Sequence, residues 1–155
     1  MPGSEVAANT SNEVNTEMIT TDELQEFGRL VGTWTVSGEA TGTVTFDWLD
    51  GGYFLVQRGT LNQAGHENRF TEMIGREKKF GEEQGTEIKS RVYDAEGNTL
   101  DYVYELDGDT LTIWGGQKGS PAYFRGTFDA DGNHLAGDWV WPGGGYHAEM
   151  TRVRP

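Results

Sequence analysis

Between residues 33 and 154, short segments in which polar and apolar residues alternate follow one another, separated by turn-forming residues. Side chains of an extended strand point to opposite faces in turn, so this period of two predicts strands with one buried face. The segment 43–48 is a clear case, because Val44, Phe46 and Trp48 fall on one face. About ten such segments, with turn signals roughly every 8–12 residues, are typical of an all-β sandwich or barrel.

The connectors between these segments are marked by glycine and acidic residues. Residues 94–98 and 129–133 share an Asp-Ala-acid-Gly-Asn pattern, which suits a type I turn followed by a left-handed glycine. Their acidic side chains resemble calcium ligands, but the long loop ending in Glu that a calcium site needs is missing. We therefore interpret both connectors as hairpin turns.

Closure is the simplest way for a long antiparallel meander to hide its edge strands. The sequence therefore predicts an all-β fold, a lipocalin-like up-and-down antiparallel β-barrel of roughly ten strands. A short helix precedes the strands, because Leu24, Phe27 and Leu30 recur at three- and four-residue spacings. Thr20 or Thr21 is the expected cap of this helix, which we expect to close one end of the barrel.

The composition indicates which classes of binding partner, and which cellular compartment, are expected for this protein. The 155 residues predict a single barrel domain over residues 21–155, preceded by a flexible acidic tail at residues 1–20. A formal net charge of −13 repels phosphates and anionic lipid heads, so nucleic acid and membranes are not expected partners. The absence of cysteine and of an apolar leader favours a cytoplasmic protein.

Two terminal motifs carry a family resemblance. Residues 30–34 resemble the Gly-x-Trp opening of lipocalin-like (calycin) barrels, and residues 150–153 resemble their closing strand. Residues 46–58 and 124–128 resemble a bacterial domain-of-unknown-function family with this fold. The resemblance implies architecture and no general activity.

Arg152 in the closing motif needs a partner, because an unpaired buried charge is costly. The resemblance implies that its guanidinium packs over Trp34. The alternative is that Arg152 holds the carboxylate of a ligand inside the barrel.

The chain also resembles the nitrobindins, haem-binding barrels with a proximal histidine on a late strand. Gly32, Trp34 and Gly38 match their opening, and His147 occupies a comparable place to that histidine. Our main expectation is that the protein uses no cofactor. The resemblance to the nitrobindins implies an alternative, in which the barrel binds haem through His147. Strand alternation leaves two registers open for His147: outward with Glu149, or inward beside it. Three scattered histidines do not predict a metal site.

The expected function is binding of a small hydrophobic or aromatic molecule in the barrel cavity. An alternative is a cofactor-independent isomerase or cyclase acting on a small hydrophobic substrate, with Tyr102, Tyr104, Gln57 or His147 donating a proton or orienting the substrate. The residues expected to bind the ligand are Phe46, Trp48, Gln57, Tyr102, Tyr104, Trp114 and Trp139.

One segment lacks the usual alternation. Residues 53–56, Tyr-Phe-Leu-Val, are apolar on both faces of the expected strand. An exposed apolar face commonly marks a contact surface, so this run predicts a homodimer interface or the docking of a helix.

Overall fold

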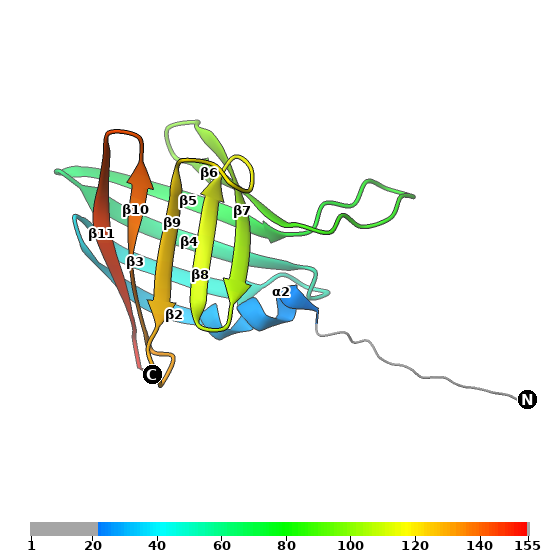
Figure 1. Cartoon of the computed structure of the whole chain (residues 1–155), viewed down its shortest axis with the longest axis horizontal. Coiled ribbons are helices and arrows are strands. Elements are labelled where there is room, and N and C mark those ends of the chain that lie inside the picture. The colour runs from blue at the N-terminus through cyan, green and yellow to red at the C-terminus, as the bar shows by residue number, and fades with distance from the viewer. Residues whose placement is uncertain (1–21, 155) are drawn as a thin grey trace, which may run out of the picture.

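The computed structural model describes residues 22–154, so the tail expected at residues 1–20 lies outside the described part of the chain. Ten antiparallel strands form a closed barrel in which each strand pairs with its neighbour in sequence (Figure 1). The last strand pairs with the first, through partners such as Met150 and Val36. The lipocalin-like up-and-down barrel expected from the sequence is therefore confirmed.

The strands run from residue 32 to residue 152 with short connections, apart from the loop between β5 and β6, which extends away from the barrel (Figure 1). The strands are β2 (Gly32–Gly38), β3 (Ala40–Trp48), β4 (Phe54–Gln63), β5 (His66–Gly75), β6 (Ile88–Asp94), β7 (Thr99–Asp107), β8 (Thr110–Gly115), β9 (Tyr123–Phe128), β10 (His134–Trp141) and β11 (Gly144–Arg152).

The hairpin between β4 and β5 is a tight turn through only two residues, Ala64 and Gly65. Both of its central residues have positive φ, 53° at Ala64 and 81° at Gly65. A two-residue turn with positive φ at both positions has a backbone twist that matches the twist of the flanking strands. Strand pairing therefore continues as far as Gln63 and His66.

A short helical segment lies at one end of the barrel, hereafter the helix end. It consists of α2 (Glu23–Glu26) and the 3-10 turn η2 (Phe27–Leu30). Asp22, rather than Thr20 or Thr21, caps α2, because its carboxylate accepts a hydrogen bond from the Leu24 amide at 3.2 Å. No helix within residues 22–154 is long and apolar enough to cross a membrane.

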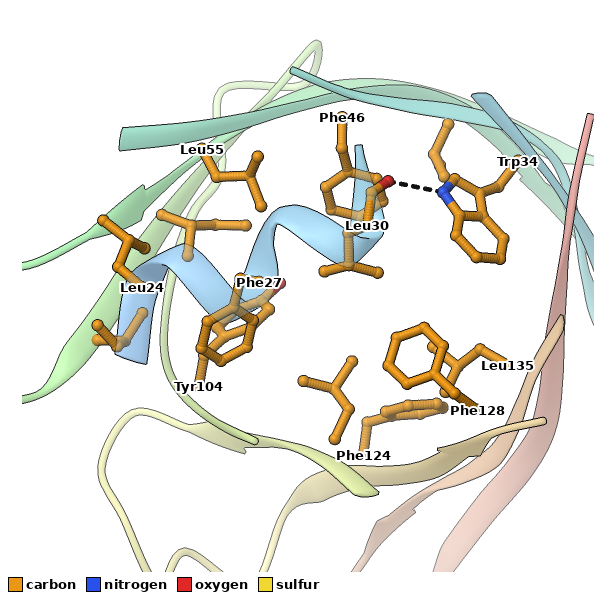
Figure 2. Close-up of a cluster of buried hydrophobic side chains, with 14 of the residues drawn as sticks. Leu24, Phe27, Leu30, Trp34, Phe46, Leu55, Tyr104, Phe124, Phe128 and Leu135 are labelled. Atoms are coloured by element: carbon orange, nitrogen blue, oxygen red, sulfur yellow. Dashed lines mark hydrogen bonds between the residues drawn. The ribbon is translucent and has the colours of Figure 1, made fainter. Parts of the chain in front are cut away.

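Leu24, Phe27 and Leu30 from this segment point into the barrel and are at most 2% exposed. Figure 2 shows them among side chains of the surrounding strands, including Phe46 and Tyr104. The apolar face expected from the helical spacing therefore closes the helix end.

Trp34 and Arg152 complete this closure. Trp34 is fully buried, and its Nε1 donates a hydrogen bond of 2.8 Å to the Leu30 carbonyl (Figure 2). The Arg152 guanidinium carbon lies 4.3 Å from the centre of the Trp34 ring, and its nitrogens donate to the carbonyls of Val31 and Arg29. The expected Arg152–Trp34 stacking is confirmed, and Arg152 does not line the cavity.

The run at residues 53–56 is partly covered by the chain itself. Leu55 faces the core and is fully buried, while Val56 points to the opposite face and is still only 2% exposed. Tyr53, which precedes β4, is 65% exposed. A homodimer contact at this run stays a prediction.

Candidate ligand-binding cavity

The barrel encloses a cavity of about 290 Å³ between Leu30 at the helix end and the far end, where hairpins such as β6–β7 and β10–β11 lie. Every strand contributes to the walls, which are mainly apolar, and all except β2 and β9 contribute two or more side chains. The larger apolar wall residues are Leu30, Phe46, Leu61, Phe70, Leu100, Leu111, Ile113, Phe124, Leu135, Trp139 and Met150.

Aromatic rings gather on one wall of the cavity. Trp139 of β10 lies with its ring centre 5.4 Å from Phe124 of β9 and 5.9 Å from Tyr102 of β7. Both pairs are tilted, the kind of arrangement that aromatic quadrupoles favour over face-to-face stacking. A flat apolar molecule in the cavity would meet this wall.

A polar cluster, formed by Gln57, Glu72, Ser90 and Tyr104, interrupts the apolar walls. Its residues come from four consecutive strands, β4 to β7. The Glu72 carboxylate accepts hydrogen bonds from Gln57 Nε2 at 2.6 Å, from Ser90 Oγ at 2.6 Å, and from the Tyr104 hydroxyl at 2.9 and 2.8 Å. The donors hold the carboxylate in one position inside the barrel.

The environment of Glu72 favours its neutral form. Glu72 is only 3% exposed, and burial raises the pKa of its carboxyl group, although the hydrogen bonds from Ser90, Tyr104 and Gln57 oppose this shift. Burial, together with the nearby Glu72 charge, also raises the pKa of the Tyr104 hydroxyl. Burial is also the main cause that raises the pKa of the Tyr102 hydroxyl to about 12. Both tyrosines are therefore protonated at neutral pH and can donate hydrogen bonds.

A second acidic side chain, Asp94, lines the far end of the cavity. Its carboxylate accepts bonds from the backbone amides of Glu96 and Asn98, and from the side-chain amides of Asn68 and Asn98. These bonds, led by the Asn98 side chain, lower the pKa of Asp94 to about 2. Asp94 therefore acts as the turn residue expected from the connector pattern.

Most of the residues expected to bind a ligand do line the cavity. The side chains that do so are Phe46, Gln57, Tyr102, Tyr104 and Trp139. Tyr102 and Tyr104 share the inner face of β7, as the alternation predicts. Their part in binding or catalysis stays a prediction.

Trp48 and Trp114 do not line the cavity, which corrects the expectation for both. Trp48 ends β3, where its indole lies beside Gly28 of η2 at the helix end. Trp114 follows the inward-facing Ile113, so alternation turns its ring to the outer face, where its Nε1 donates to Glu105.

His147 lies on the outer face of β11 in the first of the two expected registers. Its Nδ1 is 3.0 Å from the Asp138 carboxylate, and its Nε2 is 2.7 Å from that of Glu149. These two acids, Glu149 first, raise the pKa of the imidazole. From this position His147 cannot reach a haem or a substrate inside the barrel.

Glu72 is the buried acid of the cavity wall that the sequence reasoning did not identify. The same reasoning also did not assign Asn68, Asp94 and Tyr146 to this wall or Ser90 to the support of Glu72. Phe70, Glu72 and Ile74 alternate along β5, and their shared face could have indicated an acid in the interior. Met73 obscures the signal, because an apolar residue on the other face makes the inward side of this strand ambiguous.

Comparison with known proteins adds no family assignment. No family model matches the chain, and no curated protein is similar to it in sequence. Within residues 22–154, no three His, Asp or Glu side chains are grouped so as to hold a metal ion. The candidate site therefore stands on the geometry of the cavity.

Proposed function

We propose that this chain binds a small hydrophobic or aromatic molecule inside the barrel, with a polar group of the ligand beside the Glu72 carboxylate. The observation that supports this most is the cavity itself, whose walls are apolar and aromatic except for a few fixed polar groups. Small-molecule sites commonly combine these two features. The proposal agrees with the resemblance of the chain to the calycin barrels. We also propose that the chain belongs to that group of barrels.

The size of the cavity limits the ligand. An apolar cavity of about 150 Å³ is sufficient to hold benzene. The cavity here, of about 290 Å³, therefore suits a molecule of one or two rings. Burial of each methylene group in such a site contributes about 0.8 kcal/mol, so affinity should rise with the apolar surface of the ligand until the cavity is full.

Trp139 is the tryptophan placed to report binding, because it alone among the five lines the cavity. Titration with neutral ligands such as indane or butylbenzene should give saturable quenching of tryptophan fluorescence. The quenching should disappear in Trp139→Phe and persist in Trp114→Phe, whose indole lies on the outer face. Calorimetry should still detect binding to both variants.

Two alanines on neighbouring strands offer a matched test of the cavity. Ala148 of β11 lines it, whereas Ala136 of β10 lies between the inward-facing Leu135 and Gly137 and so points outward. Ala148→Leu should weaken binding at least about tenfold by occupying ligand volume, a loss of about 1.4 kcal/mol. Ala136→Leu should leave affinity unchanged. Equal effects of the two changes, or no binding of any neutral ligand, would refute the cavity as the binding site.

A second candidate function, acid–base catalysis by a cofactor-independent isomerase or cyclase, is favoured by the contact between Glu72 and Tyr104. A carboxyl group with a raised pKa beside a buried phenol is a suitable pair for moving a proton next to a carbonyl. The expected result is catalysed hydrogen–deuterium exchange at the α-carbon of a bound ketone such as 1-indanone, followed by NMR.

This exchange should be lost in Glu72→Gln and kept in His147→Ala, because His147 is on the outer face. Exchange no faster than in buffer would leave binding as the function. Exchange that depends on His147 would show that the chemistry takes place outside the cavity.

A further inference from the structure

We infer that the ligand carries a protonated amine and that the Glu72 carboxylate is its counter-ion. The inference rests on the proposed function, because it names the chemical class of the molecule bound in the same cavity. It follows from the charges on the cavity wall, from the hydrogen bonds that each acid already makes, and from the aromatic side chains nearby.

The cavity wall carries acids and no bases. Among the described residues that line the cavity, Glu72 and Asp94 are the only ones with a carboxylate side chain, and none is Lys, Arg or His. The whole chain adds to this field with a net charge of −13. A carboxylate ligand would therefore find no cationic partner in the cavity and would be repelled, whereas a cation would be attracted.

The two acids each accept four hydrogen bonds from uncharged partners, but they differ in burial. Asp94 is part of a turn in which four hydrogen bonds occupy its oxygens, and it already lies at the polar edge of the barrel. Glu72 is buried, and its three partners, Gln57, Ser90 and Tyr104, are all uncharged. A cationic partner offsets the cost of burying an ionised carboxylate more fully than uncharged donors do, and an ammonium group would supply that partner.

The surroundings of Glu72 also suit an amine on an apolar body. An ammonium group can take the place of an uncharged donor such as the Gln57 amide, and bonds between charged groups are roughly twice as strong as neutral ones. Tyr102 and Trp139, whose ring centres are 5.9 Å apart on the cavity wall, offer aromatic faces to a cation and to the rest of the molecule. The apolar walls would hold the body of the ligand.

Three ligands of one shape test the inference: 4-phenylbutylamine, 4-phenylbutanol and 4-phenylbutanoate. Calorimetry at pH 7 should give the tightest binding for the amine, at least tenfold weaker binding for the alcohol, and the weakest for the carboxylate. Glu72→Gln should bind the amine no more tightly than the alcohol. Glu149→Gln removes the same charge from the outer face and should keep the tenfold preference.

A second variant tests the same inference if the Glu72→Gln protein does not fold. Gln57→Lys would place an ammonium group of the protein next to Glu72, and it should abolish the preference for the amine while the alcohol still binds. Equal binding of amine and alcohol, or a preference that survives both changes, would overturn the inference and leave hydrophobic binding intact. Failure of all three ligands to bind would overturn the proposed function as well.

Discussion

Replacing Trp34 with alanine should lower the free energy of unfolding by about 3–5 kcal/mol, the range for large buried aromatic side chains. Trp34 is fully buried, its Nε1 donates to the Leu30 carbonyl, and its ring supports the Arg152 guanidinium. The change would leave a void beneath η2 and a carbonyl without its donor. Urea unfolding followed by circular dichroism measures the loss.

Trp114→Ala is the matched control, because it removes the same side chain from the outer face of β8. It should cost about 1 kcal/mol, the ordinary effect of a point mutation. Both variants should keep the wild-type order of ligand affinities, since neither tryptophan lines the cavity. A stable Trp34→Ala protein that no longer binds ligand would show that Trp34 serves the site rather than closure of the barrel.

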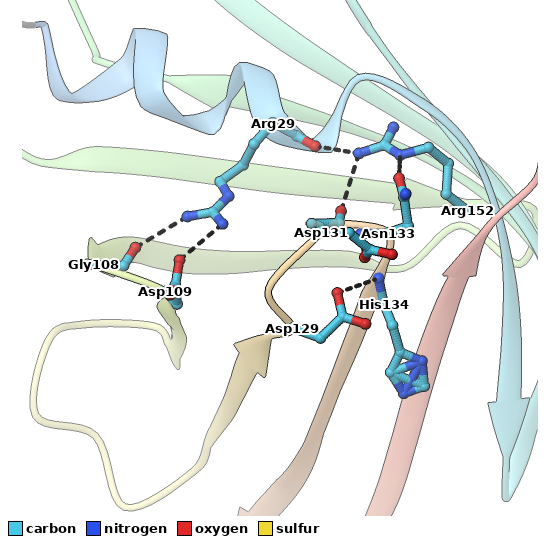
Figure 3. A network of polar contacts seen from close by, with 9 residues as sticks. Arg29, Gly108, Asp109, Asp129, Asp131, Asn133, His134 and Arg152 are labelled. Carbon is cyan, nitrogen blue, oxygen red and sulfur yellow. Dashed lines mark hydrogen bonds and ion pairs between the residues drawn. The ribbon is translucent and has the colours of Figure 1, made fainter.

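Arg152→Ala should lower the free energy of unfolding by about 3 kcal/mol, because each hydrogen bond from a charged group contributes about 1.5–3 kcal/mol and the contributions overlap. The guanidinium donates to the Arg29 carbonyl and, through Nε, to the Asn133 side chain (Figure 3). It also donates to the Val31 carbonyl. It therefore joins η2, the β9–β10 turn and the final strand at the helix end. Urea unfolding again measures the change.

Arg91→Ala provides the control for Arg152→Ala. Arg91 pairs with Asp101 on the outer face of the barrel, and both side chains are more than half exposed. Exposed pairs of this kind contribute little to stability, so the unfolding curve should move far less than for Arg152→Ala. Equal shifts for the two variants would contradict the role of Arg152 as the residue that secures the helix end.

Local sequence patterns were sufficient to predict the barrel and much of its inner face. Alternation along β3 and β7 correctly turned Phe46, Tyr102 and Tyr104 inward, because neighbouring residues of a strand must point to opposite sides. The same rule left two registers for His147, although the face that carries Tyr146, Ala148 and Met150 is the more apolar one. Pairing with β2 and β10 decided between them.

The sequence by itself determined the strands, the turns between them and the apolar face of the helix, because each depends on residues close together in the chain. Only the tertiary structure decided the polar cluster. Gln57, Glu72, Ser90 and Tyr104 lie on four strands, and their distances depend on strand register and barrel closure, which no local pattern encodes. Burial of Glu72 likewise results from the surrounding wall, so its raised pKa is a property of the closed barrel.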